Sequence, residues 1–127
     1  MSKTNSNYFE IILSFLPAVA WASLIYYLSN QQILPGFTVD IWDFLLKKSA
    51  HIFVFACLYF LLLMPYKKYD LAQGKAQWLI PLIIAILYAM FDEYHQSITP
   101  GRHPSLRDVG FDTLGCSLVL LKKLGYI

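Results

Sequence analysis

Charged residues are scarce in this chain. Asp, Glu, Lys and Arg make up 14% of its 127 residues, hydrophobic residues make up 57%, and the mean hydropathy is +0.51. Because a typical soluble domain has about 25% charged residues, this composition favours an integral membrane protein. The net charge is only +2, and the basic residues are scattered, so no nucleic-acid partner is expected.

Cysteine is also scarce, and the common catalytic motifs are missing. Cys57 and Cys116 lie in apolar segments and form no C-x-x-C pair, so neither a disulfide framework nor a cysteine zinc site is expected. The chain has no H-E-x-x-H, G-x-S-x-G or P-loop sequence, which removes motif evidence for a zinc protease, a serine hydrolase or an NTPase. We predict no cofactor and no metal; a metal held by His51, His95 and a carboxylate is the alternative.

Four apolar segments predict an all-α membrane protein, a compact bundle of about four transmembrane helices with a polar loop between the third and fourth. The predicted helices are residues 9–29, 49–66, 77–96 and 109–124, within a single domain over residues 1–127. Residues 11–28 carry no charge, and we interpret them as an uncleaved helix rather than a signal peptide. Pro17 is expected to kink this helix.

Two parts of this prediction rest on weaker patterns. Residues 41–46 form a short amphipathic stretch after the Pro35-Gly36 turn signal, and we expect this stretch to lie at the membrane interface, before a helix that begins at Ser49. In the last segment the longest run without charge is residues 113–121, which is only nine residues. A re-entrant or interfacial helix is therefore the alternative to a full crossing there.

The order of the segments brings their polar groups together. With four crossings, residues 30–48 and 97–108 lie on one side of the membrane, and the termini and residues 67–76 lie on the other. The terminal side carries six Lys and Arg residues and the opposite side carries four, so the positive-inside rule places both termini in the cytoplasm. His51, the end of the third helix and the start of the fourth then converge at the opposite face.

Residues 92–112 contain the densest group of ionisable side chains. Such groups are costly near hydrocarbon, so they mark a candidate functional site. Candidate catalytic residues, for a role still unknown, are His51, Asp92, Glu93 and His95. Candidate ligand-binding residues are Lys48, Gln96, Arg102, Arg107, Asp108 and Asp112.

Helical spacing suggests which of these side chains meet. Asp92 shares a face with His95 and Gln96, and a carboxylate beside an imidazole can orient it and raise its basicity. Asp112 lies four residues beyond Asp108, which is either a helix cap or part of the site. Asp112 is deeper in the helix, so we expect Arg102, Arg107 or His51 to be its partner. A solvated polar helix end is the structural alternative for residues 92–96, and His103 is interpreted as an exposed loop residue.

The chain resembles the VanZ-like family of membrane proteins in five places. The matching residues are Tyr27-Leu28-Ser29, Lys48-Ser49-Ala50-His51, Asp92-Glu93-Tyr94-His95-Gln96, Pro100-Gly101-Arg102, and Asp108 with Asp112 and Gly115. The family is named for an accessory protein that gives low-level resistance to the glycopeptide teicoplanin. The resemblance implies a small multi-pass protein of the bacterial cytoplasmic membrane and cell envelope. It assigns no catalytic role, because the family's biochemical activity is not established.

Two classes of function are consistent with these features. The first is a binding or accessory protein that engages an anionic headgroup through Arg102, Arg107 and His51, with membrane lipids or a lipid-linked cell-wall intermediate as partner. The second is a membrane-embedded hydrolase or transferase with His95 or His51 as general base. A purely structural or regulatory role beside other membrane proteins is a third alternative, and a homo-oligomer is a further partner hypothesis.

Overall fold

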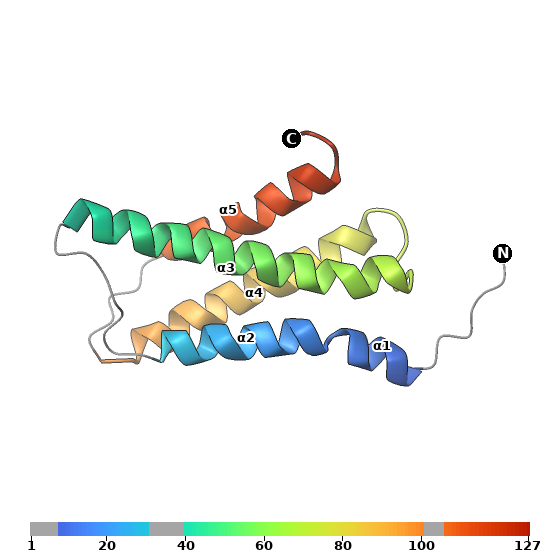
Figure 1. Ribbon diagram of the computed structural model, residues 1–127, viewed down its shortest axis with the longest axis horizontal. Coiled ribbons are helices and arrows are strands. Elements are labelled where there is room, and N and C mark those ends of the chain that lie inside the picture. Colours follow the sequence, from blue (N-terminus) through green and yellow to red (C-terminus); the bar gives the residue numbers. More distant parts are fainter. Residues whose placement is uncertain (1–7, 31–39, 101–105) are drawn as a thin grey trace.

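The chain is a bundle of helices. The computed structural model describes residues 8–30, 40–100 and 106–127, and every regular element within these ranges is an α-helix. The helices in chain order (Figure 1) are α1 (Tyr8–Ser14), α2 (Leu16–Ser29), α3 (Asp40–Lys68), α4 (Ala76–Ser97) and α5 (Leu106–Lys123). The prediction of an all-α bundle of about four helices is confirmed, since α1 and α2 together make up the first predicted span.

The first span is interrupted at Phe15, between α1 and α2. Pro17 lies in the first turn of α2, where a proline is tolerated because its missing N–H would have no partner there. Backbone hydrogen bonds continue across this interruption: the Phe15 amide donates to the Ile12 carbonyl at 3.1 Å, and the Val19 amide donates to the Phe15 carbonyl at 3.0 Å. The kink predicted from Pro17 is therefore present as a break between two helices.

Helix α3 is longer than the sequence predicted. It runs without interruption from Asp40 to Lys68, over 29 residues, so the prediction of a separate interfacial stretch at residues 41–46 and a helix start at Ser49 was wrong. The polar residues that suggested a boundary are compatible with a helix, because Asp43 and Lys47 form an i,i+4 ion pair with an oxygen–nitrogen distance of 2.6 Å. The predicted Pro35-Gly36 turn lies outside the described residues.

Within the described residues, three helical segments are long and apolar enough to span a membrane: Tyr8–Ser29, which combines α1 and α2, Ile41–Lys68 and Ala76–Ser97. Their outer faces expose large apolar side chains such as Leu24, Phe53, Phe60 and Leu87. A surface this apolar is suited to lipid rather than water. Helix α5, with 18 residues, lies where the fourth helix was predicted but is not among these three, so its full crossing stays a prediction.

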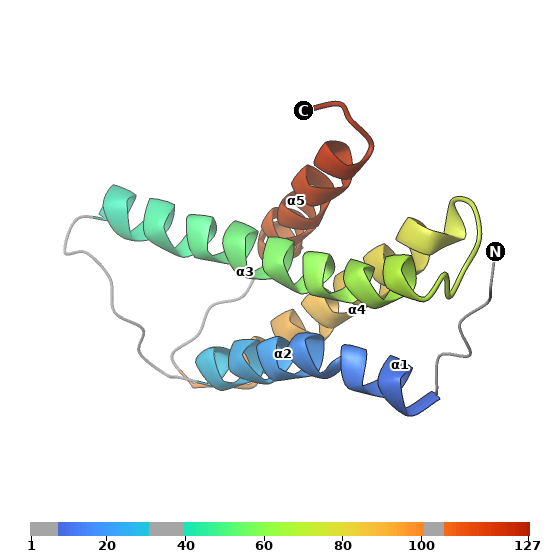
Figure 2. The same cartoon turned by 45° about the vertical axis from the view of Figure 1, so that its right-hand side comes forward.

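Helices α3 and α5 begin at the same end of the bundle and diverge toward their C-terminal ends, whereas α4 begins at the opposite end (Figures 1 and 2). The register is marked by three contacts that advance together along both helices: Lys48 with Asp108, His51 with Asp112, and the Cys116 thiol with the Phe55 carbonyl. Both helices therefore begin at the same end of the bundle, which is the arrangement that four crossings require.

A glycine brings the backbones of α3 and α5 close together. A Cβ atom at Gly115 would collide with the carbonyl group of Ile52 and would lie 3.1 Å from the Ala56 amide nitrogen. Small residues allow such close approach between membrane helices, where packing replaces the hydrophobic effect as the force for association. The tight α3–α5 contact places Asp108 and Asp112 directly against α3.

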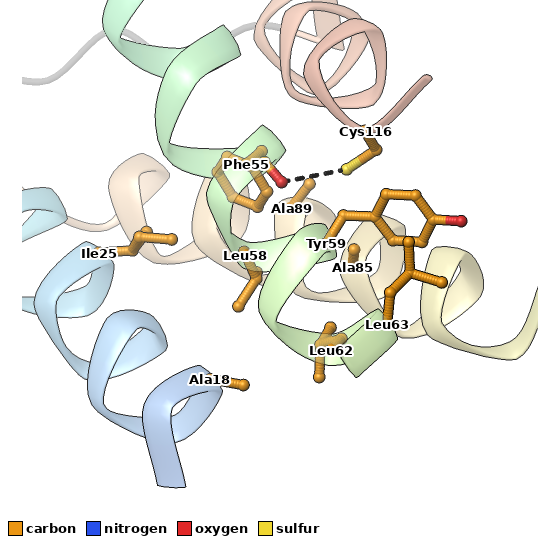
Figure 3. Close-up of a cluster of buried hydrophobic side chains, with 10 residues drawn as sticks. All are labelled: Ala18, Ile25, Phe55, Leu58, Tyr59, Leu62, Leu63, Ala85, Ala89 and Cys116. Atoms are coloured by element: carbon orange, nitrogen blue, oxygen red, sulfur yellow. Dashed lines mark hydrogen bonds between the residues drawn. The ribbon is translucent and has the colours of Figure 1, made fainter. Parts of the chain in front are cut away.

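The apolar core lies mainly along α3, at the centre of the bundle (Figure 3). Phe55 and Tyr59 of α3 are fully buried, against Ala85 and Ala89 of α4 and Cys116 of α5. Polar tips of aromatic residues then bind carbonyl groups of neighbouring helices: Trp21 Nε1 donates to Val54 O at 2.7 Å, and Tyr88 Oη donates to Ala22 O at 2.6 Å. These contacts hold α2, α3, α4 and α5 together, and each of these helices carries polar residues at one end.

Candidate polar site at one end of the bundle

The buried polar side chains gather at one end of the bundle. The C-terminal ends of α2 and α4 and the N-terminal parts of α3 and α5 lie there, at the left of Figure 1. The buried polar and charged residues at this end are Ser29, Asp92, Glu93, His95, Gln96, Thr99, Asp108 and Asp112. Thr99 donates its hydroxyl to the His95 carbonyl at 3.0 Å, and the other seven separate into two groups on different sides of α4.

The first group, which we call the ion-pair cluster, consists of Lys48, His51, Glu93, Asp108 and Asp112. Nδ1 of His51 lies 2.7 Å from Oδ1 of Asp112, whose side chain is completely buried. Nζ of Lys48 forms an ion pair with Oδ1 of Asp108 one helical turn earlier. Each α5 acid is therefore matched by one basic residue of α3.

Glu93 is the fifth member, and it comes from α4. Its side chain is 8% exposed, and it interacts electrostatically with Asp108 and Asp112 of α5 and with His51 of α3. Among the described residues, neither Glu93 carboxylate oxygen has a hydrogen-bond partner, and Oδ2 of Asp112 also has none. A buried acceptor without a donor is costly, so these atoms form the chemically unsatisfied part of the site.

The cluster also surrounds its lysine with aromatic rings. Nζ of Lys48 lies 5.5 Å from the centre of the Phe44 ring and 5.6 Å from that of Phe111, within the range of cation–π attraction. The Lys48 side chain is 19% exposed. The ammonium group therefore contacts Asp108 and two aromatic rings at a partly exposed position of the cluster.

The second group, the α2–α4 cluster, consists of Ser29, Asp92, Gln96, Tyr26 and His95. The Ser29 hydroxyl donates to Oδ1 of Asp92, and Nε2 of Gln96 donates to Oδ2 of Asp92 at 2.9 Å and to the Ser29 oxygen at 3.4 Å. These bonds attach the end of α2 to the end of α4. The expected shared face of Asp92 and Gln96 is present.

His95, which was predicted to share a helix face with Asp92, stacks on the ring of Tyr26. The two ring centres are 4.4 Å apart and the planes are inclined by 6°. Nδ1 of His95 is buried and has no hydrogen-bond partner in the described part of the chain. The carboxylate–imidazole pair that the structure describes is His51–Asp112, one of the three partners expected for Asp112.

The basic residues of the predicted site differ in position. Arg107 is exposed in the first turn of α5, beside the ion-pair cluster in sequence. Arg102 and His103 lie outside the described residues. Within the described ranges, no group of three or more His, Cys, Asp or Glu side chains is arranged to hold a metal ion.

Sequence reasoning missed two contacts of this site. Tyr26 was not among the candidate site residues, but it forms the stacking surface for His95. Lys48 was a candidate ligand-binding residue, yet nothing in the sequence identified Asp108 as its partner. The three-residue spacing of Tyr26 and Ser29, which places both on one helix face, is the signal that could have indicated a polar side of α2.

The comparisons with known proteins bear on this arrangement. The profile of the VanZ/LLP1 family matches residues 1–122 of the 127-residue chain. The search of curated proteins and the search of solved structures returned no match. The matched range contains every residue of both polar clusters and the start of each of the five helices. It also contains residues 27–29, 48–51 and 92–96, in which the sequence resembles the family. By its sequence, its apolar helices and the extent of this match, the chain belongs to the VanZ/LLP1 family of membrane proteins.

Proposed function

We propose that this VanZ/LLP1 protein binds an anionic, lipid-linked headgroup at the polar end of its helix bundle. The observation that carries this proposal is a set of buried oxygen atoms, both of Glu93 and Oδ2 of Asp112, that have no hydrogen-bond donor among the described residues. The partly exposed Lys48 belongs to the same cluster. A ligand with hydrogen-bond donors and an anionic group would complement both features. Membrane lipids and lipid-linked cell-wall intermediates combine these properties.

The anionic part of the ligand would meet Arg107. This side chain is exposed in the first turn of α5, and no ion pair to it is found within the described residues. Arg is suited to bidentate contact with a phosphate group, and the N-terminal end of a helix adds a favourable dipole. Lys48, already paired with Asp108, would add positive charge at the same end of the bundle.

The donor groups of the ligand would reach further in. Glu93 and Asp112 offer carboxylate oxygens that accept hydroxyl, amide or amine donors. Because these atoms are buried, each bond made to them removes a desolvation penalty of about 1–3 kcal/mol. The proposed ligand therefore has its phosphate at the surface and its donors inside the bundle.

The proposal includes a place in the envelope. With both termini in the cytoplasm, the polar end would face the outer leaflet, where cell-wall intermediates and glycopeptide antibiotics meet. An accessory role like that of the teicoplanin-resistance protein is the biological function that this placement supports. The orientation of the bundle in the membrane and the identity of the ligand both belong to this proposal.

Native mass spectrometry of the protein released from bacterial membranes tests the binding function. We expect the wild-type chain to retain a phosphate-bearing lipid and Arg107→Ala to lose most of it. Lys67→Ala is the matched control, since it removes an exposed basic side chain from the opposite end of α3. A wild-type protein without bound lipid, or equal retention in Arg107→Ala, contradicts the proposal.

A second candidate function is supported by the His51–Asp112 pair. A buried carboxylate 2.7 Å from Nδ1 orients the imidazole and leaves Nε2 as the nitrogen that could accept a proton, as in general-base catalysis. This arrangement favours His51 over His95 as the base of a lipid hydrolase or transferase. Conversion of the retained lipid to a product of different mass, abolished in His51→Gln, would support the enzyme over the binding protein.

A further inference from the structure

The ion-pair cluster contains one more acid than it has basic partners. Lys48 forms an ion pair with Asp108 and His51 with Asp112, whereas none of the ion pairs among the described residues includes Glu93. The Glu93 side chain is 8% exposed, and it interacts electrostatically with His51 of α3 and with Asp108 and Asp112 of α5. The excess of one acid is therefore located at a buried position.

The atoms without partners specify what would compensate this charge. They are both oxygens of Glu93 and Oδ2 of Asp112, while Oδ1 of Asp112 is already bound to His51. Three acceptors correspond in number to the three N–H donors of a primary ammonium group. Hydrogen bonds in which both partners are charged are the strongest of this kind.

Other cations fit this position less well. The described residues contain no set of three or more metal-ligating side chains in a suitable arrangement. A quaternary ammonium has no N–H donor and is held by aromatic rings, but Phe44 and Phe111 already flank Lys48, and Tyr26 stacks on His95 in the α2–α4 cluster. Lys48 itself shows that this end of the bundle accommodates an ammonium group beside a carboxylate.

We propose that Glu93 and Asp112 form a binding site for the primary ammonium group of a zwitterionic headgroup, a phosphate ester that carries an amine. This inference rests on the proposed binding function and names its ligand class. The phosphate lies at Arg107 and the ammonium group replaces the missing cation beside Glu93. A headgroup of this kind satisfies both the exposed arginine and the buried acceptors.

Lipid retention by the full chain, measured with native mass spectrometry from lipid mixtures of equal composition, tests the ligand class. The probes are phosphatidylethanolamine, its N-monomethyl and N,N-dimethyl derivatives, phosphatidylcholine and phosphatidylglycerol. We expect retention to fall with each methyl group and to differ about tenfold between phosphatidylethanolamine and phosphatidylcholine, as the loss of charge-assisted hydrogen bonds implies. This series uses the wild-type protein, so it does not depend on a variant that folds.

Two variants then locate the site. Glu93→Gln should reduce the preference for phosphatidylethanolamine over phosphatidylcholine to about one, because it removes the unpaired charge with little change in volume. Asp70→Asn is the matched control, since it makes the same chemical change at an exposed residue between α3 and α4. Retention of lipid by Glu93→Gln with an undiminished preference overturns the assignment to Glu93.

The remaining outcomes separate this inference from the function on which it rests. Equal retention of phosphatidylethanolamine, phosphatidylcholine and phosphatidylglycerol overturns the ammonium site but leaves an anionic-headgroup protein. Retention of none of them overturns both proposals. Soluble O-phosphoethanolamine distinguishes the source of the amine: displacement of the lipid supports recognition of the headgroup alone, and failure to displace it supports a lipid-borne ligand.

Discussion

Nδ1 of His51 lies 2.7 Å from Oδ1 of Asp112, and the Asp112 side chain is completely buried. This contact joins α3 to α5 at the level where the polar end of the bundle meets the apolar core. Removal of one partner from a buried ion pair leaves an uncompensated polar group and typically costs about 3–5 kcal/mol. The pair therefore has a structural role whatever ligand the protein binds.

A double-mutant cycle measures that role. We expect His51→Ala and Asp112→Ala each to lower the free energy of unfolding by several kcal/mol, and the double variant to lose clearly less than the sum. SDS titration in mixed micelles gives the values. The control cycle uses Asp43 and Lys47, whose ion pair is 25% and 45% exposed and should contribute about 1 kcal/mol or less. Additive effects at His51 and Asp112 would contradict a coupled pair.

Two glycines of α5 should respond oppositely to alanine. A Cβ at Gly115 meets the Ile52 carbonyl, whereas a Cβ at Gly110 has no atom within 4 Å. Gly115→Ala forces α5 away from α3 and should destabilise the protein by about 1–3 kcal/mol or more. Gly110→Ala should be neutral or stabilising by up to about 1 kcal/mol, because alanine has the higher helix propensity.

The same micelle titration checks this pair of substitutions. Helix content by circular dichroism should remain, since the effect is on packing between helices and not on the helix itself. A Gly115→Ala protein as stable as Gly110→Ala would show that the close approach at Ile52 is not required. Such a result would also mean that the contact at Gly115 does not explain the register of α3 and α5, in which Asp108 lies beside Lys48.

The sequence predicted the existence of the helices better than their boundaries. Long uncharged runs such as residues 11–28 require a helix in a membrane, because every backbone polar group must be satisfied within the segment. The start of α3 at Asp40 was missed because Asp43, Lys47 and Lys48 resemble a loop in composition. In the structure these residues are ion-paired, and their charges do not end the helix.

The candidate site was predictable as a location but not as a set of contacts. Topology alone brings His51, Asp92 and Asp112 to the same end, and His51 was among the partners expected for Asp112. The parallel register of α3 and α5 could not be derived, because it depends on the close approach at Gly115. Without that register, the sequence gives no signal for the pairing of Lys48 with Asp108, or for the absence of a hydrogen-bond partner of Glu93 among the described residues.

The serine at the end of α2 should contribute to stability through Asp92. Ser29 is buried and donates to Oδ1 of Asp92, so Ser29→Ala removes a donor from a buried carboxylate and should cost about 1–3 kcal/mol. Ser23→Ala is the control, because Ser23 is exposed and donates only to the Val19 carbonyl of its own helix. Equal stability of the two variants would contradict a role for Ser29 in attaching α2 to α4.

The orientation of the bundle is testable by cysteine labelling in intact bacterial cells. In a background with Cys57→Ala and Cys116→Ala, single cysteines at Asn30 and Leu124 mark the two ends: both residues are exposed, and they follow α2 and α5. We expect a membrane-impermeant maleimide to label Asn30→Cys and not Leu124→Cys, because the polar site should face outward and α5 should cross the membrane. Labelling of Leu124→Cys alone would reverse the orientation and place the site at the cytoplasmic face. Labelling of both would show that α5 returns to the side from which it starts, so that Lys122 and Lys123 would lie beside the polar site rather than across the membrane from it.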